Sequence, residues 1–574
     1  MATITQLCRR CLLIRQIAYF ALPKFKECSY RNRLIREKNI LLNGNGQNLI
    51  RIHSTSRGFG TVSFKASKLS LESDKPSDCT TFQDLGNENR LHPKLVKTLS
   101  DDLKFNTMMP IQKATIRDLI DDRANCLAQA KTGTGKTIAF LLPAIQTLVT
   151  KDPSPGKHIS LLVLSPTREL ALQIAEEAKG LLQRFFQYKV RVCIGGTNKE
   201  KEQKDIIKNC DILIATPGRL LDHLSEPRFI EKFQALDTLV LDEADRLLDM
   251  GFMKDIERII SYLPDKVSSK RQAMLFSATQ TPRVSKVADL VLGKDYKFIS
   301  TIPVGEKLTH ERVIQKLITV PKFSDLAPAL FANIQREVQL RGSGVFKTIV
   351  FAPTAALADF YGHILQSVSG IPNVSVLHSR ASQKKRNRII AQFREAKTGV
   401  LVATDVVARG IDIPAVTDVI QVGLPMNKEA YIHRLGRTAR AGTEGGGMFF
   451  LTEAEKFFPS KSLADIKFLE CQPDLSLSEE VLQIAANMEE EKFKKIYQSW
   501  IGYYRTHIKE MGWTAQYLVV EANKFAKEGL RAPEIPMLTK DTIAKMGLRG
   551  MNGFNIKPKK ARNTNKTIIE SDAT

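Results

Sequence analysis

A rhythm of short apolar segments separated by longer helical patterns is the feature that most constrains how this 574-residue chain can fold. The longer patterns include Glu169–Phe185 and Lys254–Leu263. Strands that are apolar on both faces and alternate with helices are typical of a parallel sheet covered by helices on both sides. Four such segments occur in the first half of the chain: Leu161–Leu164, Ile212–Ile214, Leu239–Leu241 and Met274–Phe276.

The same rhythm restarts beyond the Pro303–Phe323 region, which indicates a second domain of the same kind. We therefore predict an α/β fold made of two tandem parallel-sheet domains. Sheets of this type bind ligands beyond the carboxyl ends of their strands, so a ligand is expected at the cleft between the domains. The second set of segments is Thr348–Phe351, Val374–Leu377, Val400–Ala403, Val419–Val422 and Met448–Leu451.

The charge of the chain is strongly basic and unevenly distributed. Lys and Arg exceed Asp and Glu by 24, and residues 1–66 hold 12 basic residues against 2 acidic ones. A surplus of this size favours a polyanionic partner, such as nucleic acid or an anionic membrane surface. Eight cysteines without regular spacing indicate a reducing compartment and exclude a small disulfide-stapled scaffold.

The N-terminal segment has the composition of a targeting sequence. Residues 1–26 contain no acidic residue, and five basic residues interrupt their apolar positions. An amphipathic, Arg-rich and acid-poor start is typical of a mitochondrial transit peptide, and Arg15 leaves no apolar stretch long enough to span a membrane. We assign residues 1–45 to a transit-like segment and 46–80 to a linker. The alternative is a basic arm that touches RNA.

A glycine-rich loop in the first domain predicts phosphate binding. Its glycines allow backbone N–H groups to approach phosphate oxygens, its lysine adds a positive charge, and its last threonine can ligate Mg²⁺. The alternative is a glycine-rich turn between a strand and a helix, with a solvated lysine. The predicted nucleotide-binding residues of the loop are Ala130, Lys131, Thr132, Gly133, Thr134, Gly135, Lys136 and Thr137.

An acidic cluster follows the apolar segment at Leu239–Leu241. Asp242 and Glu243 begin this cluster, at a strand end, where carboxylates can hold Mg²⁺ and orient an attacking water. Alone, such a cluster is more often the charge complement of a helix N-terminus. Combined with the phosphate loop, it predicts hydrolysis of a nucleoside triphosphate, with Thr137 and Asp242 as the metal ligands.

Further motifs occur in a fixed order along residues 81–470, and with the acidic cluster Asp242–Asp245 they resemble the DEAD-box RNA helicases of superfamily 2. The resemblance implies two RecA-like domains, at 81–302 and 323–470, joined by a linker at 303–322. They close over ATP and single-stranded RNA. The motifs are Gln112, Pro166–Leu170, Gly195–Gly196, Thr216–Arg219, Ser277–Thr279, Phe351, Gln383 with Arg386, Thr404–Asp405, Ala408–Asp412 and His433–Arg440.

The resemblance also implies the residue roles at the ATP site. Phe105 stacks on adenine and Gln112 hydrogen-bonds its edge, while Glu243 polarises the attacking water. Arg437 and Arg440 are candidate arginine fingers from the second domain, so hydrolysis is expected to need domain closure. The remaining implied residues are Gly410 and Asp412 at the nucleotide, with Asp412 on the ribose, and Ser277, Thr279 and His433, which couple the nucleotide to RNA.

The implied RNA contacts come from other loops of both domains. Arginine side chains and exposed backbone amides bind the sugar-phosphate chain without reading bases, which predicts sequence-independent binding of one RNA strand. DNA is not expected as a substrate. The implied RNA-binding residues are Pro166, Thr167, Arg168, Gly196, Thr216, Gly218, Arg219, Gln383, Arg386 and Thr404.

One residue departs from the family pattern, and two C-terminal regions extend it. Ala439 stands where the family usually has Gly, a change that costs little if the local φ is negative. Residues 471–546 are expected to form a helical C-terminal extension, whose apolar stripe either packs on the second domain or lengthens the RNA track. Residues 547–574 read as a disordered basic tail.

The whole pattern resembles the fungal mitochondrial DEAD-box RNA chaperones that assist intron splicing and RNA folding. We expect a monomeric ATP-dependent RNA helicase of the mitochondrial matrix that uses ATP and Mg²⁺ and binds no membrane. Its protein partners are unknown. The alternative is an ATP-gated RNA clamp that serves as an assembly platform and unwinds little.

Overall fold

The computed structural model describes residues 80–151, 154–302, 313–342, 345–367, 370–371, 373–405, 413–439 and 445–557. The transit-like segment and the linker up to residue 79 lie outside these ranges. So do the predicted site residues Gly410, Asp412 and Arg440 and most of the basic tail.

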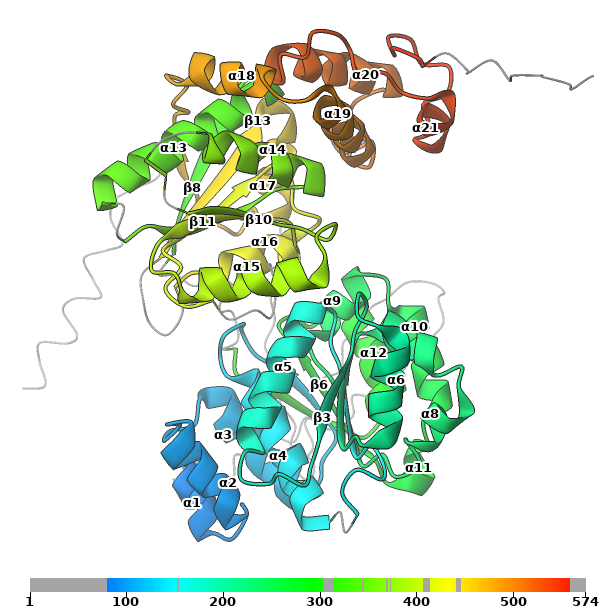
Figure 1. Ribbon diagram of the computed structural model, residues 1–574. Helices are drawn as coiled ribbons and strands as arrows, with labels where there is room; N and C mark the ends of the chain where they lie inside the picture. The colour runs from blue at the N-terminus through cyan, green and yellow to red at the C-terminus, as the bar shows by residue number, and fades with distance from the viewer. Residues whose placement is uncertain are drawn as a thin grey trace, which may run out of the picture. The chain divides into compact units, whose positions relative to one another are not determined.

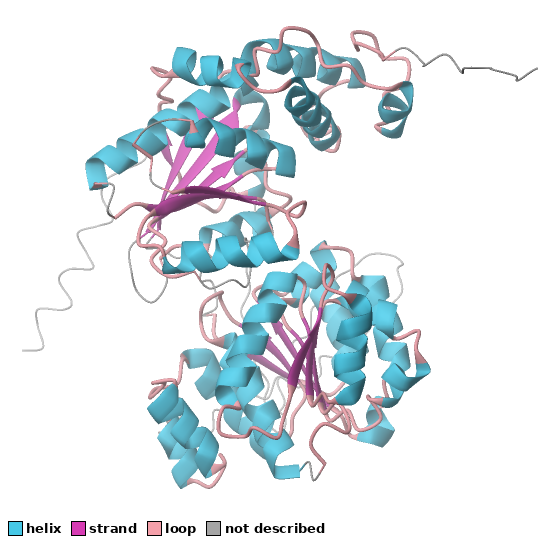
Figure 2. Ribbon diagram, viewed as in Figure 1, coloured by secondary structure: helices cyan, strands magenta, loops and turns pink. Residues whose placement is uncertain are grey.

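The first domain is a parallel sheet of seven strands with helices on both faces (Figures 1 and 2). Two apolar cores, one on each face, bury the central strands, as the apolar segments predict. The strand order is β3-β4-β2-β5-β6-β1-β7. The strands are β1 (Cys126–Gln129), β2 (Leu161–Leu164), β3 (Val190–Cys193), β4 (Ile212–Ala215), β5 (Thr238–Leu241), β6 (Gln272–Ser277) and β7 (Lys297–Ser300).

Several helices of this domain begin at a residue whose side chain caps them. Thr167, Asn198 and Thr281 each accept a backbone N–H from the first turn of the helix that follows, which stabilises the helix start. The helices are α1 (Phe82–Asn87), α2 (Pro93–Lys97), α3 (Pro110–Asp121), α4 (Lys136–Lys151), α5 (Arg168–Leu181), α6 (Lys199–Lys208), α7 (Pro217–His223), α8 (Pro227–Glu231), α9 (Ala244–Asp249), α10 (Met253–Tyr262), α11 (Lys266–Ser269) and α12 (Pro282–Leu292).

The second domain repeats this sheet in the order β10-β11-β9-β12-β13-β8-β14, again with parallel pairing throughout. Residues 313–320, assigned above to the linker, instead form the strand β8 between β13 and β14. The strands are β8 (Val313–Val320), β9 (Lys347–Phe351), β10 (Val374–Leu377), β11 (Gly399–Ala403), β12 (Asp418–Val422), β13 (Gly445–Thr452) and β14 (Leu469–Cys471). The helices are α13 (Leu326–Arg341), α14 (Ala355–Gln366), α15 (Gln383–Glu395), α16 (Lys428–Leu435) and α17 (Phe457–Ser462). The prediction of an α/β fold with two tandem RecA-like domains is confirmed.

A helical extension follows the second domain and shares its core. The ring of Trp500 lies 5.0 Å from that of Phe323, and the Tyr504 hydroxyl donates to Glu455 at 2.9 Å. The apolar stripe therefore packs on the second domain. The extension consists of α18 (Ser478–Ala486), α19 (Glu490–Tyr504), α20 (Ala515–Lys524) and α21 (Lys540–Lys545). None of the helices in the described ranges combines the length and the hydrophobicity of a transmembrane span.

Candidate nucleotide and RNA sites

The glycine-rich loop connects β1 to α4 at the carboxyl edge of the first sheet. Gly133 and Gly135 have φ values of 76° and 84°, in the left-handed region that glycine adopts without strain. A Cβ on Gly135 would lie only 2.4 Å from the Gln112 side-chain nitrogen. That nitrogen donates to the Gly135 carbonyl at 3.0 Å, so Gln112 and the loop form one unit.

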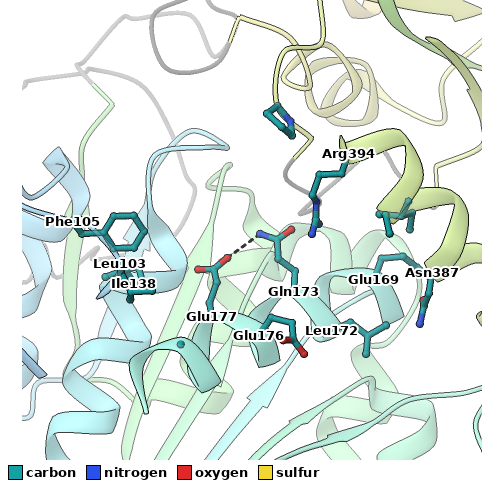
Figure 3. A pocket seen from close by; sticks show the side chains of 14 residues that line it. Leu103, Phe105, Ile138, Glu169, Leu172, Gln173, Glu176, Glu177, Asn387 and Arg394 are labelled. Atoms are coloured by element: carbon teal, nitrogen blue, oxygen red, sulfur yellow. Dashed lines mark hydrogen bonds between the residues drawn. The ribbon is translucent and has the colours of Figure 1, made fainter. Parts of the chain in front are cut away.

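Lys136 lies inside this loop, where it is 8% exposed and its Nζ donates to the Ala130 carbonyl at 2.9 Å. The lysine is therefore held within the loop, where the implied phosphates would bind. Phe105 is 44% exposed and borders a cavity of about 610 Å³ beside Leu103 and Ile138 (Figure 3). An exposed aromatic ring can stack on a planar base, but neither Gln112 nor residues 130–137 of the phosphate loop line this cavity.

The acidic pair stands directly after β5, as predicted. Asp242 is 3% exposed, and burial together with the charge of Glu243 raises its pKa to about 7, although Lys136 partly offsets this. Glu243 has a φ of 47°, a strained value for a residue with a Cβ, and its buried Oε2 has no hydrogen-bond partner among the described residues. An excess of buried negative charge with an unsatisfied oxygen suits a divalent cation. The Asp242 carboxylate and the Thr137 hydroxyl supply oxygen ligands of the kind that Mg²⁺ prefers.

One buried carboxylate bridges the two domains near this pair. Asp245 accepts hydrogen bonds from the Thr279 hydroxyl and the His433 ring Nε2, both at 3.2 Å. The Ser277 hydroxyl donates to the Thr279 carbonyl at 2.8 Å, which fixes the loop that carries Thr279. Residues of both domains thus share one hydrogen-bond network.

The end of α16 lies directly against the phosphate loop. A Cβ on Gly436 would lie 2.7 Å from the Thr132 hydroxyl oxygen. Arg437, the next residue, is 2% exposed, and its Nε donates to the His433 carbonyl at 3.3 Å. The structure therefore brings this finger candidate to the nucleotide side of the domain boundary.

The predicted RNA residues converge on a second cavity of about 690 Å³. Nine of the ten line it: Pro166, Thr167, Arg168, Gly196, Thr216, Gly218, Arg219, Arg386 and Thr404. Gln383, the tenth, donates to the Glu169 carboxylate at 3.0 Å. Gly196 has a φ of 86°, in the left-handed region that favours glycine, and a Cβ there would lie 2.7 Å from an Arg168 guanidinium nitrogen.

Several charged residues of the domain boundary were missed by the sequence analysis, although each belongs to or adjoins a motif. The Glu169 carboxylate pairs with the Arg386 guanidinium at 2.7 Å, across the boundary. Arg434 grips both carboxylate oxygens of Asp405, at 2.7 and 3.0 Å, and the Arg246 guanidinium donates to the Asp405 carbonyl. Their position in the sequence could have identified them, because Glu169 directly follows Arg168 and Arg434 directly follows His433.

The backbone at Ala439 does not have the negative φ on which the expected small cost of this residue depended. Its φ is +53°, in the left-handed region, so alanine at this position carries backbone strain of about 1 kcal/mol. The prediction of a small cost depended on a negative φ and is wrong for this backbone.

These features define a nucleotide-driven enzyme with two parallel α/β domains, one with the phosphate loop and the other with arginines at the boundary. Two family models match the chain: "DEAD/DEAH box helicase" at residues 109–287 and "Helicase conserved C-terminal domain" at 331–442. The chain belongs to the DEAD-box family and is an ATP-dependent RNA helicase.

Relatives and solved structures agree with this placement. The chain is 42% identical to the mitochondrial ATP-dependent RNA helicase MSS116 of Phaeosphaeria nodorum, covering 79% of this chain and 84% of that protein. It is 40% identical to DEAD-box ATP-dependent RNA helicase 26 of Oryza sativa subsp. japonica, covering 80% and 84%. A structure of Mss116p (NTE and C-tail double deletion) bound to ssRNA and AMP-PNP matches with a TM-score of 0.74 and 32% identity, covering 83% and 96%.

Proposed function

We propose that this helicase is a mitochondrial RNA chaperone that couples ATP binding and hydrolysis to local unwinding of structured RNA, in support of intron splicing, RNA folding or translation. The observation that carries the proposal is the cavity lined by nine of the ten predicted RNA residues from both domains. The mitochondrial MSS116 relatives and the Mss116p structure bound to ssRNA support it.

The chemistry of the lining supports binding of one strand without sequence preference. Arg168, Arg219 and Arg386 offer guanidinium groups, and Gly196 and Gly218 expose backbone amides. Such groups bind phosphate oxygens and leave the base edges unread. A strand held across both domains follows a path set by the protein, which separates it locally from its complement.

At the nucleotide site, each predicted residue has a separate role. Gln112 recognises the adenine edge, Lys136 binds phosphate oxygens and Glu243 orients the attacking water. Thr137 and Asp242 would hold Mg²⁺, which would neutralise charge at the phosphates. Arg437, Arg440 and Asp412 complete the site from the second domain, so hydrolysis follows closure.

A strand-displacement assay tests this function. A short RNA duplex with a single-stranded tail is incubated with ATP or with a non-hydrolysable analogue, and the ATPase rate is measured with and without RNA. Multiple-turnover displacement with ATP, together with RNA-stimulated hydrolysis, supports the proposal. Stable retention of RNA without displacement would indicate the ATP-gated clamp instead, and equal hydrolysis without RNA would contradict both.

The compartment and the remaining partner predictions have tests of their own. Residues 1–45 fused to a fluorescent protein are expected to direct it to the mitochondrial matrix, and a fusion with the five basic residues of 1–26 changed to Gln is expected to stay outside. We expect a monomer in light scattering and no displacement of a DNA duplex.

A further inference from the structure

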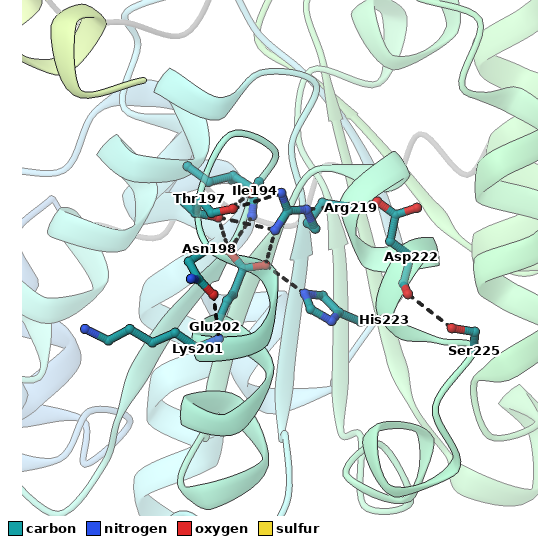
Figure 4. Close-up of polar contacts among 9 residues, drawn as sticks. All are labelled: Ile194, Thr197, Asn198, Lys201, Glu202, Arg219, Asp222, His223 and Ser225. Carbon is teal, nitrogen blue, oxygen red and sulfur yellow. Dashed lines mark hydrogen bonds and ion pairs between the residues drawn. The ribbon is translucent and has the colours of Figure 1, made fainter. Parts of the chain in front are cut away.

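A partly buried polar cluster joins the β3–α6 loop of the first domain to α6 and α7 (Figure 4). We call Thr197, Glu202, Arg219 and His223 the Glu202 cluster. Glu202 Oε1 accepts from Arg219 Nη1 at 3.2 Å and from His223 Nε2 at 2.8 Å. Its Oε2 accepts from the Thr197 hydroxyl at 2.6 Å and from the Ile194 N–H at 3.4 Å. One carboxylate therefore ties the β3–α6 loop to the helix α7.

Both terminal nitrogens of the Arg219 guanidinium donate hydrogen bonds within the cluster. Besides the bond from Nη1 to Glu202, its Nη2 donates to the Thr197 carbonyl at 3.3 Å. Its side chain is only 11% exposed, although the residue lines the RNA cavity. A free arginine side chain loses rotamer entropy on binding a ligand, whereas this arginine is already ordered.

The charges within the cluster balance. Burial raises the pKa of the Glu202 carboxyl, but the hydrogen bonds from His223 and Thr197 and the charge of Arg219 outweigh burial and hold the pKa below its usual value. The His223 ring is fully buried, and its Nδ1 has no hydrogen-bond partner among the described residues. The Arg219 guanidinium and the Glu202 carboxylate form an ion pair, with Nη1 and Oε1 3.2 Å apart.

We propose that Glu202 is a positioning residue that fixes the Arg219 guanidinium for RNA binding, and that His223 fixes the Glu202 carboxylate in turn. His223 stacks on the buried ring of Phe229, with ring centroids 5.0 Å apart, and this contact fixes the His223 ring against the apolar core. The inference rests on the proposed role of Arg219 in RNA binding.

A metal site is the competing interpretation of these residues. Ligand atoms of Cys193, Glu202 and His223 lie within 4.8 Å of one another. However, both Glu202 oxygens already accept hydrogen bonds, and a neighbouring guanidinium repels a cation. Burial also holds the pKa of the Cys193 thiol well above its usual value, which disfavours the thiolate that a metal would bind.

A double-mutant cycle on the full chain tests the proposal. Parent, Glu202→Gln, Arg219→Ala and the double variant are compared by the RNA KM of the ATPase, by kcat at saturating RNA and by melting temperature. Glu202→Gln keeps the side-chain length but removes the charge, and it is expected to raise the RNA KM about tenfold with kcat within twofold. In the Arg219→Ala background the same change is expected to have no further effect. Additive effects, or an unchanged KM, would overturn the proposal.

Two further variants separate positioning from general structure. His223→Phe keeps the aromatic stacking but removes the donor, and it is expected to raise the RNA KM about threefold. Glu200→Gln, an exposed residue on the same helix, is the matched control and is expected to match the parent. A fall in melting temperature that tracks the KM change in all variants would instead indicate a merely structural cluster.

The remaining outcomes are also decisive. One equivalent of zinc in the purified protein, lost in Cys193→Ser, would replace the positioning role with a metal site. RNA-stimulated ATPase in the parent with no response to Glu202→Gln would refute this inference alone. A parent that neither binds single-stranded RNA nor is stimulated by it would refute the proposed function, and this inference with it.

Discussion

The two domains share one strand order yet differ in the loop that follows their first strand. In each sheet the order is the third, fourth, second, fifth, sixth, first and seventh strand of the domain. After β1 comes the glycine-rich loop with Gly133 and Gly135, whereas β8 is followed by a short helical turn at Phe323–Asp325. Phe323 packs against Trp500 and Tyr504 of the extension. The scaffold is therefore common, and the chemistry lies in loops grafted on it.

The second domain contributes differently to the shared boundary. Among the described residues, its predicted nucleotide contact comes from the end of α16, where Arg437 follows Gly436. The same helix carries Arg434, which pairs with Asp405. This comparison predicts that one domain binds the nucleotide and the other completes its hydrolysis. The following substitutions test that division.

Arg437→Ala gives the largest expected effect. Loss of an arginine finger reduces kcat by on the order of 10³-fold, whereas binding of a non-hydrolysable ATP analogue to the first domain is expected to change little. Single-turnover hydrolysis and analogue binding are measured side by side. Arg336→Ala, at an exposed position on α13, is the control. A loss of analogue binding as large as the loss of hydrolysis would break the proposed division.

Glu243→Gln tests the first domain in the same assay. Removal of a group that orients and polarises water is expected to slow hydrolysis by about 10²–10³-fold while nucleotide binding is kept. Glu257→Gln, exposed on α10, serves as the control. Near-normal turnover would exclude Glu243 from this role.

Asp242→Asn tests the electrostatics of the nucleotide-free first domain. The pKa of Asp242 rises from 3.8 to about 7, so between these values the folded state binds the proton that the unfolded state has lost. Stability therefore falls as pH rises through this window, and it is not recovered above it. Asparagine, which cannot ionise, is expected to raise the free energy of unfolding by about 1–3 kcal/mol at pH 8 and to have no effect near pH 3. Denaturant unfolding at both pH values measures this, and an equal gain at both would contradict the electrostatic cause.

Ala439→Gly is expected to have the smallest effect, and it concerns the second domain. Glycine relieves the strain of the positive φ, so the free energy of unfolding is expected to rise by about 0.5–1 kcal/mol. Ala454→Gly, in the short helical turn after β13, is the matched control and is expected to be destabilising. A destabilised Ala439→Gly variant would show that the left-handed backbone is not under strain.

The sequence predicted the buried centre of each sheet better than its edges. Leu161–Leu164 and Val400–Ala403 are apolar throughout and fully buried, and both form strands. Three of the four edge strands, β3, β7 and β14, are partly exposed and lack an apolar run, and β8 alternates buried and exposed residues. These strands gave no comparable signal, because solvent on one side permits polar residues. Two strands break this trend: the edge strand β10 was predicted as Val374–Leu377, and the interior strand β1 was not predicted.

The same contrast holds for the sites. The phosphate loop is local in sequence, so its spacing alone predicts its shape. Glu202 and His223 lie in no motif, and their role follows only from the fold, which places α6 beside α7. The boundary pairs Arg386–Glu169 and Arg434–Asp405 depend in the same way on tertiary contacts.

A Cβ at position 436 would lie 2.7 Å from the Thr132 hydroxyl oxygen, so the space between the end of α16 and the phosphate loop is smaller than one methyl group. A valine at position 436 would act as a spacer, because its Cβ alone already meets the Thr132 hydroxyl. This substitution would keep the two domains apart. Ligand affinities measured on such a variant would be those of each domain alone, without the contribution that comes from contact between the domains.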